Sequence, residues 1–254
     1  MEEYQKLFSR FLAVEDILFF GENLNLKDGR PTPYFVNMGK CNSAVLLWTL
    51  GHHFSKAIRQ KLPAVVNTIF GPSYKASSIA VATSFALMHD LGLNFKFDYD
   101  RKEAKTHGDA SGKEKLMVTC GIEDYANIVI LDDVATSMVT KYETLKKIDL
   151  EVKNRQLANV NISGILVGVD REQTTAVYRD PGDNSTVVLG EKGQNARIDF
   201  TNDTKIPVYA IARIRDIIDH LYDTRTPVLQ NNRKEPISNQ TMDTFRKYME
   251  TYGV

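Results

Sequence analysis

An apolar segment that ends in two adjacent acids constrains the fold more than any other part of this chain. Residues 128–140 read Ile-Val-Ile-Leu-Asp-Asp-Val-Ala-Thr-Ser-Met-Val-Thr. The apolar run is typical of a buried strand, and the small hydroxyl residues beyond the acids lead into a helical pattern. Two carboxylates at a sheet edge could hold neighbouring hydroxyls of a sugar, and the N–H groups of the turn and helix N-terminus could bind its phosphate. An ordinary strand-to-helix loop is the alternative interpretation.

The rest of the chain repeats this alternation of apolar strands and helices. We predict strands at 65–70, 95–99, 116–119, 126–131, 162–169 and 208–212. We predict helices at 7–18, 44–62, 76–91, 139–150, 214–222 and 241–252, with a loop at 227–236. This order indicates an α/β fold with a mostly parallel central sheet flanked by helices. Ligands in such sheets bind at the carboxyl ends of the strands.

Composition limits the classes of function. The 254 residues suit one large domain, and 32 basic side chains balance 32 acidic ones. A general binder of nucleic acids or anionic membranes normally carries a basic excess, so neither partner is expected. No apolar run approaches the roughly 20 residues of a membrane span. Cys41 and Cys120 lack metal-ligand spacing, and we expect them to be reduced in a cytoplasmic protein.

Two adjacent histidines, His52 and His53, fall within the helix predicted at 44–62. Neighbouring residues in a helix point about 100° apart, so these two imidazoles do not form a metal-binding pair. We expect both to be surface or interface residues.

Two further motifs carry positive charge beside predicted strand ends. Gly-Pro-Ser-Tyr-Lys at 71–75 forms a tight turn, and Lys75 at the start of the next helix is either a solvated lysine or an anion ligand. The polar run at 101–108, Arg-Lys-Glu-Ala-Lys-Thr-His-Gly, is compatible with a flexible charged loop. A loop so rich in cations can also close over a diphosphate and neutralise its charge as it leaves.

Two other motifs suit a flat, acidic partner. Arg171 follows the strand predicted at 162–169 and could pair bidentately with a planar acid group. The segment 27–37, Lys-Asp-Gly-Arg-Pro-Thr-Pro-Tyr-Phe-Val-Asn, combines a lysine with aromatics that could stack on a flat ring. Together the motifs indicate a diphosphorylated sugar and a flat anion as ligands.

In this order, the motifs resemble those of orotate phosphoribosyltransferases, a family of type I phosphoribosyltransferases. The similar segments are 26–37, 70–75, 100–108, 128–140, 169–171 and the C-terminal helix at 245–254. The resemblance covers nearly the full chain. It implies a single domain over 1–254 with the type I phosphoribosyltransferase fold. A small hood would be built from the N-terminal segment, about 1–40, and the C-terminal part. An inserted excursion at about 179–195 has no counterpart in the family pattern.

The resemblance also implies a reaction and roles for individual residues. Orotate and 5-phosphoribosyl 1-diphosphate would give orotidine 5′-monophosphate and diphosphate in pyrimidine (UMP) biosynthesis. The catalytic residues would be Arg101, Lys102, Lys105 and His107, which close over the diphosphate, and Asp132 and Asp133, which hold the ribose hydroxyls. The substrate-binding residues would be Lys27, Tyr34, Phe35 and Arg171 for orotate, Tyr74 and Lys75 for the diphosphate, and Thr136, Ser137, Met138, Val139 and Thr140 for the 5′-phosphate.

The family further implies a metal and an assembly. Mg²⁺ would be held mainly through the substrate diphosphate and water, in keeping with its reluctance to lose water. The chain would form a homodimer in which the loop at 101–114 reaches the neighbouring site. The protein would then work by positioning and charge stabilisation around an oxocarbenium-like transition state.

The phosphate loop departs from the family pattern. Thr-Ala-Gly-Thr is usual, and Thr-Ser-Met-Val stands at 136–139. A glycine accepts positive φ, whereas Met138 in the left-handed region would cost about 1–2 kcal/mol. Because backbone N–H groups remain, we expect phosphate binding to survive. At 76–78, Ala-Ser-Ser replaces Gly-Ile-Pro.

Two other functions remain open at this point. A phosphoribosyltransferase for another base would use the same sugar-phosphate site. A non-catalytic protein that binds phosphoribosyl diphosphate and regulates a partner would fit the altered phosphate loop. The complete polar loop at 101–108 favours an enzyme.

Overall fold

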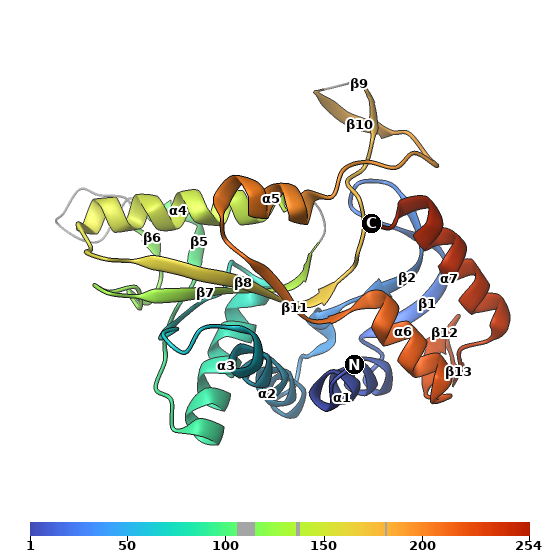
Figure 1. Ribbon diagram of the computed structural model, residues 1–254, viewed down its shortest axis with the longest axis horizontal. Helices are drawn as coiled ribbons and strands as arrows, with labels where there is room; N and C mark the ends of the chain where they lie inside the picture. Colours follow the sequence, from blue (N-terminus) through green and yellow to red (C-terminus); the bar gives the residue numbers. More distant parts are fainter. Residues whose placement is uncertain (106–114, 136–137, 181) are drawn as a thin grey trace.

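A five-stranded parallel sheet forms the centre of the molecule (Figure 1). The computed structural model describes residues 1–105, 115–135, 138–180 and 182–254, and of 103–105, 115 and 183–185 only the backbone. The strands lie in the order β11 (Val208–Arg213), β8 (Asn161–Asp170), β7 (Asn127–Ala135), β3 (Thr68–Phe70) and β4 (Lys96–Asp98). All four pairings are parallel, so every strand ends at the same edge.

Strand β7 shows why these residues form a sheet that is buried on both faces. Ile128 and Ile130 point into one apolar cluster, whereas Val129 and Leu131 point into another on the opposite face. The four side chains are fully buried. Alternation across a strand distributes a continuous apolar run equally between two cores.

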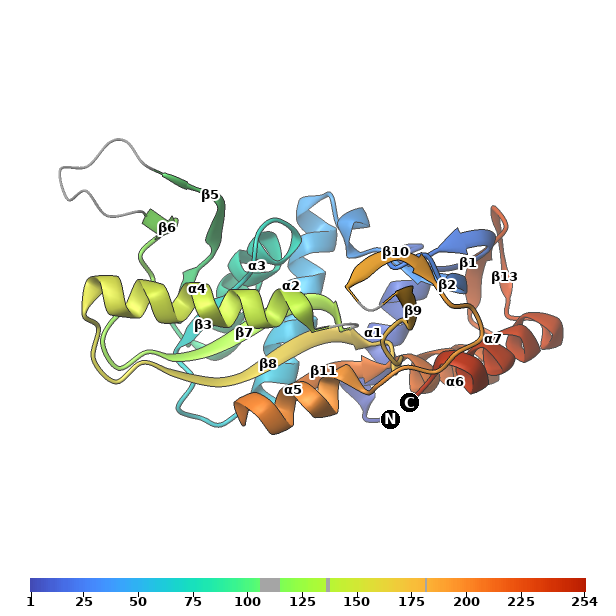
Figure 2. The same cartoon turned by 90° about the horizontal axis from the view of Figure 1, so that it is seen from above.

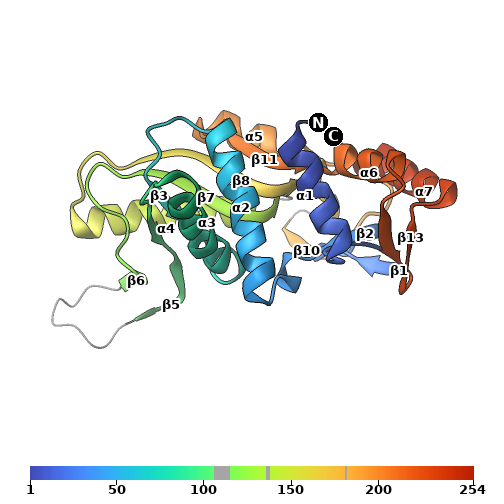
Figure 3. The ribbon, with the colours of Figure 1, turned by 90° about the horizontal axis from the view of Figure 1, so that it is seen from below.

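Helices cover both faces of this sheet (Figure 1, Figure 3). One face carries α1 (Glu3–Val14), α2 (Ala44–Lys61) and α3 (Lys75–Leu91), and the other carries α4 (Val139–Arg155) and α5 (Ala196–Thr204). Helix α2 begins where the Ser43 side chain accepts a hydrogen bond from the Leu46 N–H group, a normal N-cap. None of the helices in the described residues is long and apolar enough for a membrane crossing.

A second sheet lies beside the carboxyl edge of the first and combines both ends of the chain. Its strand order is β13 (Arg233–Pro236), β12 (Pro227–Gln230), β1 (Leu18–Asn25) and β2 (Pro31–Val36). Helix α6 (Ile214–Asp223) follows β11, and α7 (Asn239–Tyr252) packs against β2. Tyr34 of β2 meets the rings of Phe245 and Tyr248 edge-on, at 5.6 and 6.0 Å between centroids. A short turn, η1 (Met38–Lys40), leads from β2 towards α2.

Two hairpins project from this body, the β5–β6 hairpin as seen in Figure 2 and the β9–β10 hairpin as seen in Figure 1. Strands β5 (Asp100–Lys105) and β6 (Lys115–Met117) pair antiparallel and extend away from the central sheet, so the polar run predicted as a loop begins as a strand. Strands β9 (Tyr178–Asp180) and β10 (Asp183–Val187) form the other hairpin, within the segment predicted as an excursion.

Several element boundaries differ from the sequence predictions. The helix predicted at 7–18 ends at Val14, because Asp16 takes a φ of 55° and turns the chain into β1. The strand predicted at 126–131 continues to Ala135, so the acid pair lies within it. Helix α5 and the hairpin of β12 and β13 were not predicted, because both segments are short and polar. The prediction of surface position was wrong for His53, which is buried against Phe8 and Phe11.

Candidate active site

A tight turn after β3 brings the first cation to the carboxyl edge of the sheet. The Gly71 N–H group donates to the Asp98 carbonyl at 3.0 Å. A Cβ atom at Gly71 would lie 2.1 Å from the Ala76 carbonyl oxygen, so a larger residue would force the backbone apart. The turn ends at Lys75, the first residue of α3, and Lys75 Nζ lies 3.4 Å from a carboxylate oxygen of Asp133.

The acid pair of β7 is held by two lysines. Asp133 contacts Lys75, which is exposed, whereas Asp132 contacts the Nζ atom of Lys141, which is buried in α4. Lys141 Nζ also donates to the Val134 carbonyl at 3.3 Å. Burial, followed by the neighbouring charge of Asp132, raises the pKa of the Asp133 carboxyl, while the two lysines oppose this shift. The result is a compact, charge-balanced group of oxygen acceptors.

The N-terminus of α4 follows the acid pair. Met138 is the residue before the helix and has a φ of 58°, the left-handed conformation that glycine accepts without cost. Its side chain is buried in the apolar cluster under α4 and α5. Val139 and Thr140 are exposed in the first turn. Thr136 and Ser137, which we predicted as phosphate ligands, lie outside the described residues.

Replacing Met138 with glycine should lower stability, even though it removes backbone strain. Relief of the left-handed conformation gains about 1–2 kcal/mol. Losing a buried methionine side chain costs about 2–5 kcal/mol, so the free energy of unfolding should fall, by up to about 4 kcal/mol. Urea unfolding of the Met138→Gly variant measures this change.

A matched control separates strain from packing. Gln156 ends α4 with a φ of 55°, but its side chain is exposed. A Gln156→Gly variant removes the same strain without a cavity, and it should raise the free energy of unfolding by about 1–2 kcal/mol. Equal destabilisation of both variants would contradict this account.

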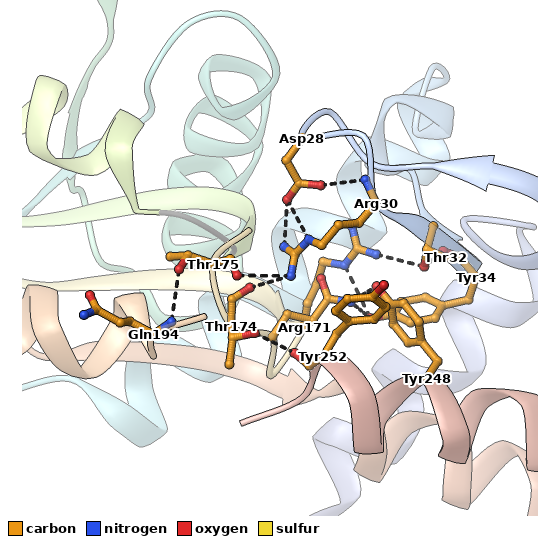
Figure 4. Close-up of polar contacts among 11 residues, drawn as sticks. Asp28, Arg30, Thr32, Tyr34, Arg171, Thr174, Thr175, Gln194, Tyr248 and Tyr252 are labelled. Atoms are coloured by element: carbon orange, nitrogen blue, oxygen red, sulfur yellow. Dashed lines mark hydrogen bonds and ion pairs between the residues drawn. The ribbon is translucent and has the colours of Figure 1, made fainter. Parts of the chain in front are cut away.

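Arg171 lies directly after β8, buried among side chains of β2 (Figure 4). Its Nε atom donates to the Tyr34 hydroxyl at 3.3 Å, and Nη2 donates to Thr32 Oγ1 at 3.4 Å. The guanidinium carbon lies 4.9 Å from the Tyr34 ring centre and 5.9 Å from that of Phe35. Among the residues with described side chains, no carboxylate lies within ion-pair distance of this buried cation.

Arg30, another buried arginine nearby, has its own anion. Its Nη2 and Nε atoms donate to an Asp28 carboxylate oxygen at 2.7 and 3.0 Å, and Nη1 donates to the Thr174 carbonyl at 2.9 Å (Figure 4). Arg30 therefore has a structural role, joining the turn before β2 to the segment after β8. Arg171, by contrast, is a buried cation that has neutral hydrogen-bond partners but no carboxylate partner among the residues with described side chains.

Two other residues complete the polar surroundings of Arg171. Gln173 donates to the Tyr248 hydroxyl, while the buried Gln173 Oε1 atom has no hydrogen-bond partner in the described part of the chain. Burial raises the pKa of Tyr34 to about 12, so its hydroxyl stays protonated at neutral pH. Sequence reasoning missed Gln173, Tyr248, Arg30 and Lys141. Arg30 and Tyr248 lie within segments that we had singled out, 26–37 and 245–254, whereas Gln173 and Lys141 lie just outside the motifs.

Of the four catalytic residues predicted in the β5–β6 hairpin, the structure describes the side chains of Arg101 and Lys102. Lys102 Nζ lies 5.4 Å from the ring centre of Tyr74, which is exposed. Both residues, with Arg101, line a cavity of about 700 Å³. The Nε atom of Arg101 is buried and has no hydrogen-bond partner among the described residues. The Lys105 side chain and all of His107 lie outside the described part of the chain.

The predicted orotate residues divide into two groups. Tyr34 and Phe35 lie together with Arg171, as the sequence motifs suggested. Lys27 is exposed on the turn before β2, and the structure gives it no contact with that group. Its predicted role depends on the resemblance alone.

A parallel α/β sheet with an acid pair in its central strand, a following helix N-terminus and a cationic turn defines the phosphoribosyltransferase class of fold and site. No family model matches the chain. The orotate phosphoribosyltransferase of Bifidobacterium adolescentis is 33% identical over 252 residues, which cover 97% of this chain and 96% of that protein. The orotate phosphoribosyltransferase of Lachnoclostridium phytofermentans is 30% identical over 254 residues, 100% and 99% of the two chains. The chain belongs to the orotate phosphoribosyltransferase family.

Solved structures agree with the fold. The orotate phosphoribosyltransferase of Francisella tularensis superposes with a TM-score of 0.70 at 24% identity, covering 98% of this chain and all of that one. The UMP synthase of Leishmania donovani gives a TM-score of 0.62 at 19% identity and covers 97% of this chain but 42% of that protein. These likenesses confirm the predicted fold class of a parallel sheet flanked by helices.

Proposed function

We propose that this chain transfers the 5-phosphoribosyl group from 5-phosphoribosyl 1-diphosphate to orotate, giving orotidine 5′-monophosphate and diphosphate in pyrimidine biosynthesis. The buried Arg171 carries this proposal, because its guanidinium has no carboxylate partner among the described residues and stacks against Tyr34 and Phe35. A buried charge without a counter-ion is costly. A flat ring bearing a carboxylate would supply both the missing anion and a stacking surface.

The sugar-phosphate site is assigned from the adjacent strand ends. Asp132 and Asp133 accept hydrogen bonds from the ribose hydroxyls, while Lys75 and Lys141 balance their charge. Residues 136–140 hold the 5′-phosphate at the α4 N-terminus, where backbone N–H groups point outward. Tyr74 and Lys75 contact the diphosphate, and Lys27, on the resemblance alone, contacts the substrate near the reacting ring.

The chemistry requires positioning and charge stabilisation. The bond between ribose C1 and the diphosphate oxygen breaks, the orotate ring nitrogen N1 forms the new bond to C1, and the proton that N1 loses leaves with the diphosphate. Positive charge builds on the ribose and negative charge on the leaving diphosphate. Arg101, Lys102, Lys105 and His107 stabilise the leaving group when the β5–β6 hairpin closes.

The acid pair fits an indirect role with Mg²⁺. Both carboxylates already contact lysines, which reduces the negative charge available for direct coordination. Mg²⁺ keeps several waters and binds readily to diphosphates, so the substrate would carry it into the site. When bound, it supplies charge neutralisation to the diphosphate.

The proposed partners are small molecules and a second copy of this chain. We place the reaction in the cytoplasm, in keeping with the free Cys41 and Cys120, and propose no nucleic-acid or membrane partner. The chain is proposed to act as a single domain over 1–254, with a hood built in part from residues 1–40 and an excursion at 179–195.

An exposed apolar face supports the proposed homodimer. Val45 and Trp48 on α2, with Phe85 and Met88 on α3, are all exposed large apolar residues. The ring of Trp48 on α2 lies 5.3 Å from the ring of His89 on α3. His89 is one helical turn after Phe85, so the apolar residues of the two helices lie on a common face. Burial against a second copy would remove this surface from water.

A charge in this face should dissociate the dimer. We expect the Phe85→Glu variant to weaken self-association by about 30-fold or more, the effect of losing about 2 kcal/mol at an interface centre. Sedimentation velocity over a concentration series measures this constant. Val65, which is equally exposed but lies before β3, provides the control as Val65→Glu. Dissociation by both variants, or by neither, would contradict this assignment.

An absorbance assay tests the proposed reaction. Purified protein with phosphoribosyl diphosphate and Mg²⁺ should consume orotate and leave uracil and adenine unchanged. Turnover of another base would replace the proposal with a different phosphoribosyltransferase. Retained binding of phosphoribosyl diphosphate without turnover of any base would favour the regulatory protein.

A further inference from the structure

Three metal-ligating side chains meet on the outer surface of α2 and α3. His52 comes from α2, and His89 and Asp90 come from the last turn of α3. The His52 Nδ1 atom lies 2.5 Å from one Asp90 carboxylate oxygen, and the His89 Nδ1 atom lies 3.0 Å from the other. One ligand atom from each residue falls within 4.8 Å of the other two.

The packing of the two helices holds these side chains together. A Cβ atom at Gly51 would lie 2.5 Å from the Ala82 carbonyl oxygen, so glycine allows the two backbones to approach closely. Trp48 then packs edge-on against both imidazoles, at 4.7 Å from His52 and 5.3 Å from His89. The rings are therefore constrained by a neighbour that takes no part in ligation.

We propose that His52, His89 and Asp90 bind a divalent transition metal ion of the Zn²⁺ or Ni²⁺ type. Two imidazoles and a carboxylate form a ligand set that suits these ions, with a further position left for water. The site adjoins a cavity of about 510 Å³ lined by His52 and Asp90, which gives a solvent molecule room to bind. All three ligands come from one chain, so the site does not require the dimer.

This site differs from the proposed Mg²⁺ position in chemistry and in place. Mg²⁺ prefers oxygen ligands, whereas two of the three groups here are nitrogen donors. His89 lies 14 residues after Lys75 along α3, which corresponds to about 20 Å at the helical rise of 1.5 Å per residue. Lys56 and Arg59 line the same cavity and oppose a cation, so the affinity depends on the ligand bonds.

Trp48 provides a direct readout, because it is the only tryptophan in the sequence and touches both imidazoles. Titration with Ni²⁺ alone should quench its fluorescence saturably at one equivalent per chain. Zn²⁺ should compete with Ni²⁺ and reverse the quenching, whereas Mg²⁺ should have no effect.

Variants identify the ligands. His89→Gln and His52→Gln should each weaken Ni²⁺ binding by more than about 100-fold. Loss of a residue that only hydrogen-bonds to a metal ligand weakens binding by about 10- to 100-fold, so a direct ligand should exceed this effect. His89 is largely exposed, so its replacement leaves the fold intact, which circular dichroism checks. His220→Gln, on α6, is the matched histidine control and should bind as the unmodified chain does.

Unsaturable quenching, or equal quenching of the chain and its His89→Gln variant, would overturn the proposal and leave Asp90 as a hydrogen-bond acceptor for two imidazoles. Orotate turnover is measured separately, without Ni²⁺ or Zn²⁺. Absence of saturable Ni²⁺ quenching together with normal orotate turnover would therefore reject the metal site and leave the proposed reaction intact.

Discussion

Replacing Arg171 with lysine should lower kcat/KM for orotate by about 100- to 1000-fold. Removing a hydrogen-bonding partner from a buried charge pair costs about 2–5 kcal/mol, and a 100- to 1000-fold loss of kcat/KM lies within that range of free energies. Lysine keeps the charge but loses the planar, two-point geometry and the stacking on Tyr34 and Phe35. Affinity for phosphoribosyl diphosphate should change little, because this substrate binds at other residues.

Steady-state kinetics with each substrate varied in turn measures this difference. Arg197 provides the control, because its Nε atom lies 3.3 Å from Asp170, the last residue of the same strand, yet its guanidinium is partly exposed. An Arg197→Lys variant should retain its activity. An Arg171→Lys variant with an unchanged KM for orotate and an unchanged kcat would show that the buried guanidinium does not bind orotate.

The sequence predicts those parts of the fold that depend on local patterns. Strands β7 and β8 are continuous apolar runs, and such runs must be covered on both faces. The parallel sheet follows from this, and so does the gathering of Lys75, Asp133 and Arg171 at one edge. The resemblance added their order along the chain, and the relatives confirm the family.

The parts that the sequence did not predict depend on contacts between distant residues. Strand β12 pairs with β1 across about 200 residues, and its four residues, Pro-Val-Leu-Gln, are too few to show the alternation that predicts a strand. In the sequence nothing distinguishes Lys141 from other helical lysines, because its pairing with Asp132 depends on the fold. The roles of Lys105, His107, Thr136 and Ser137 stay predictions.

The two acids of β7 should respond differently to the same substitution. Asp133→Asn should lower kcat/KM by about 10- to 100-fold, since a hydrogen bond to a charged acceptor contributes about 1.5–3 kcal/mol. Its stability should change by less than about 1 kcal/mol, because the partner Lys75 is exposed and such ion pairs contribute little. Urea unfolding and orotate turnover measure the two effects independently.

Asp132→Asn should lose both activity and stability. Its partner Lys141 is buried, and a buried cation deprived of its carboxylate costs about 3–5 kcal/mol, so the midpoint of urea unfolding should fall clearly. Replacing the lysine as well, in an Asp132→Asn/Lys141→Met double variant, removes the unpaired charge and should restore most of the stability. Activity should stay low, because the carboxylate that accepts from the ribose is still absent. If the double variant recovered turnover together with stability, Asp132 would serve only to neutralise Lys141, and Asp133 would be the only acid of the pair that binds the sugar.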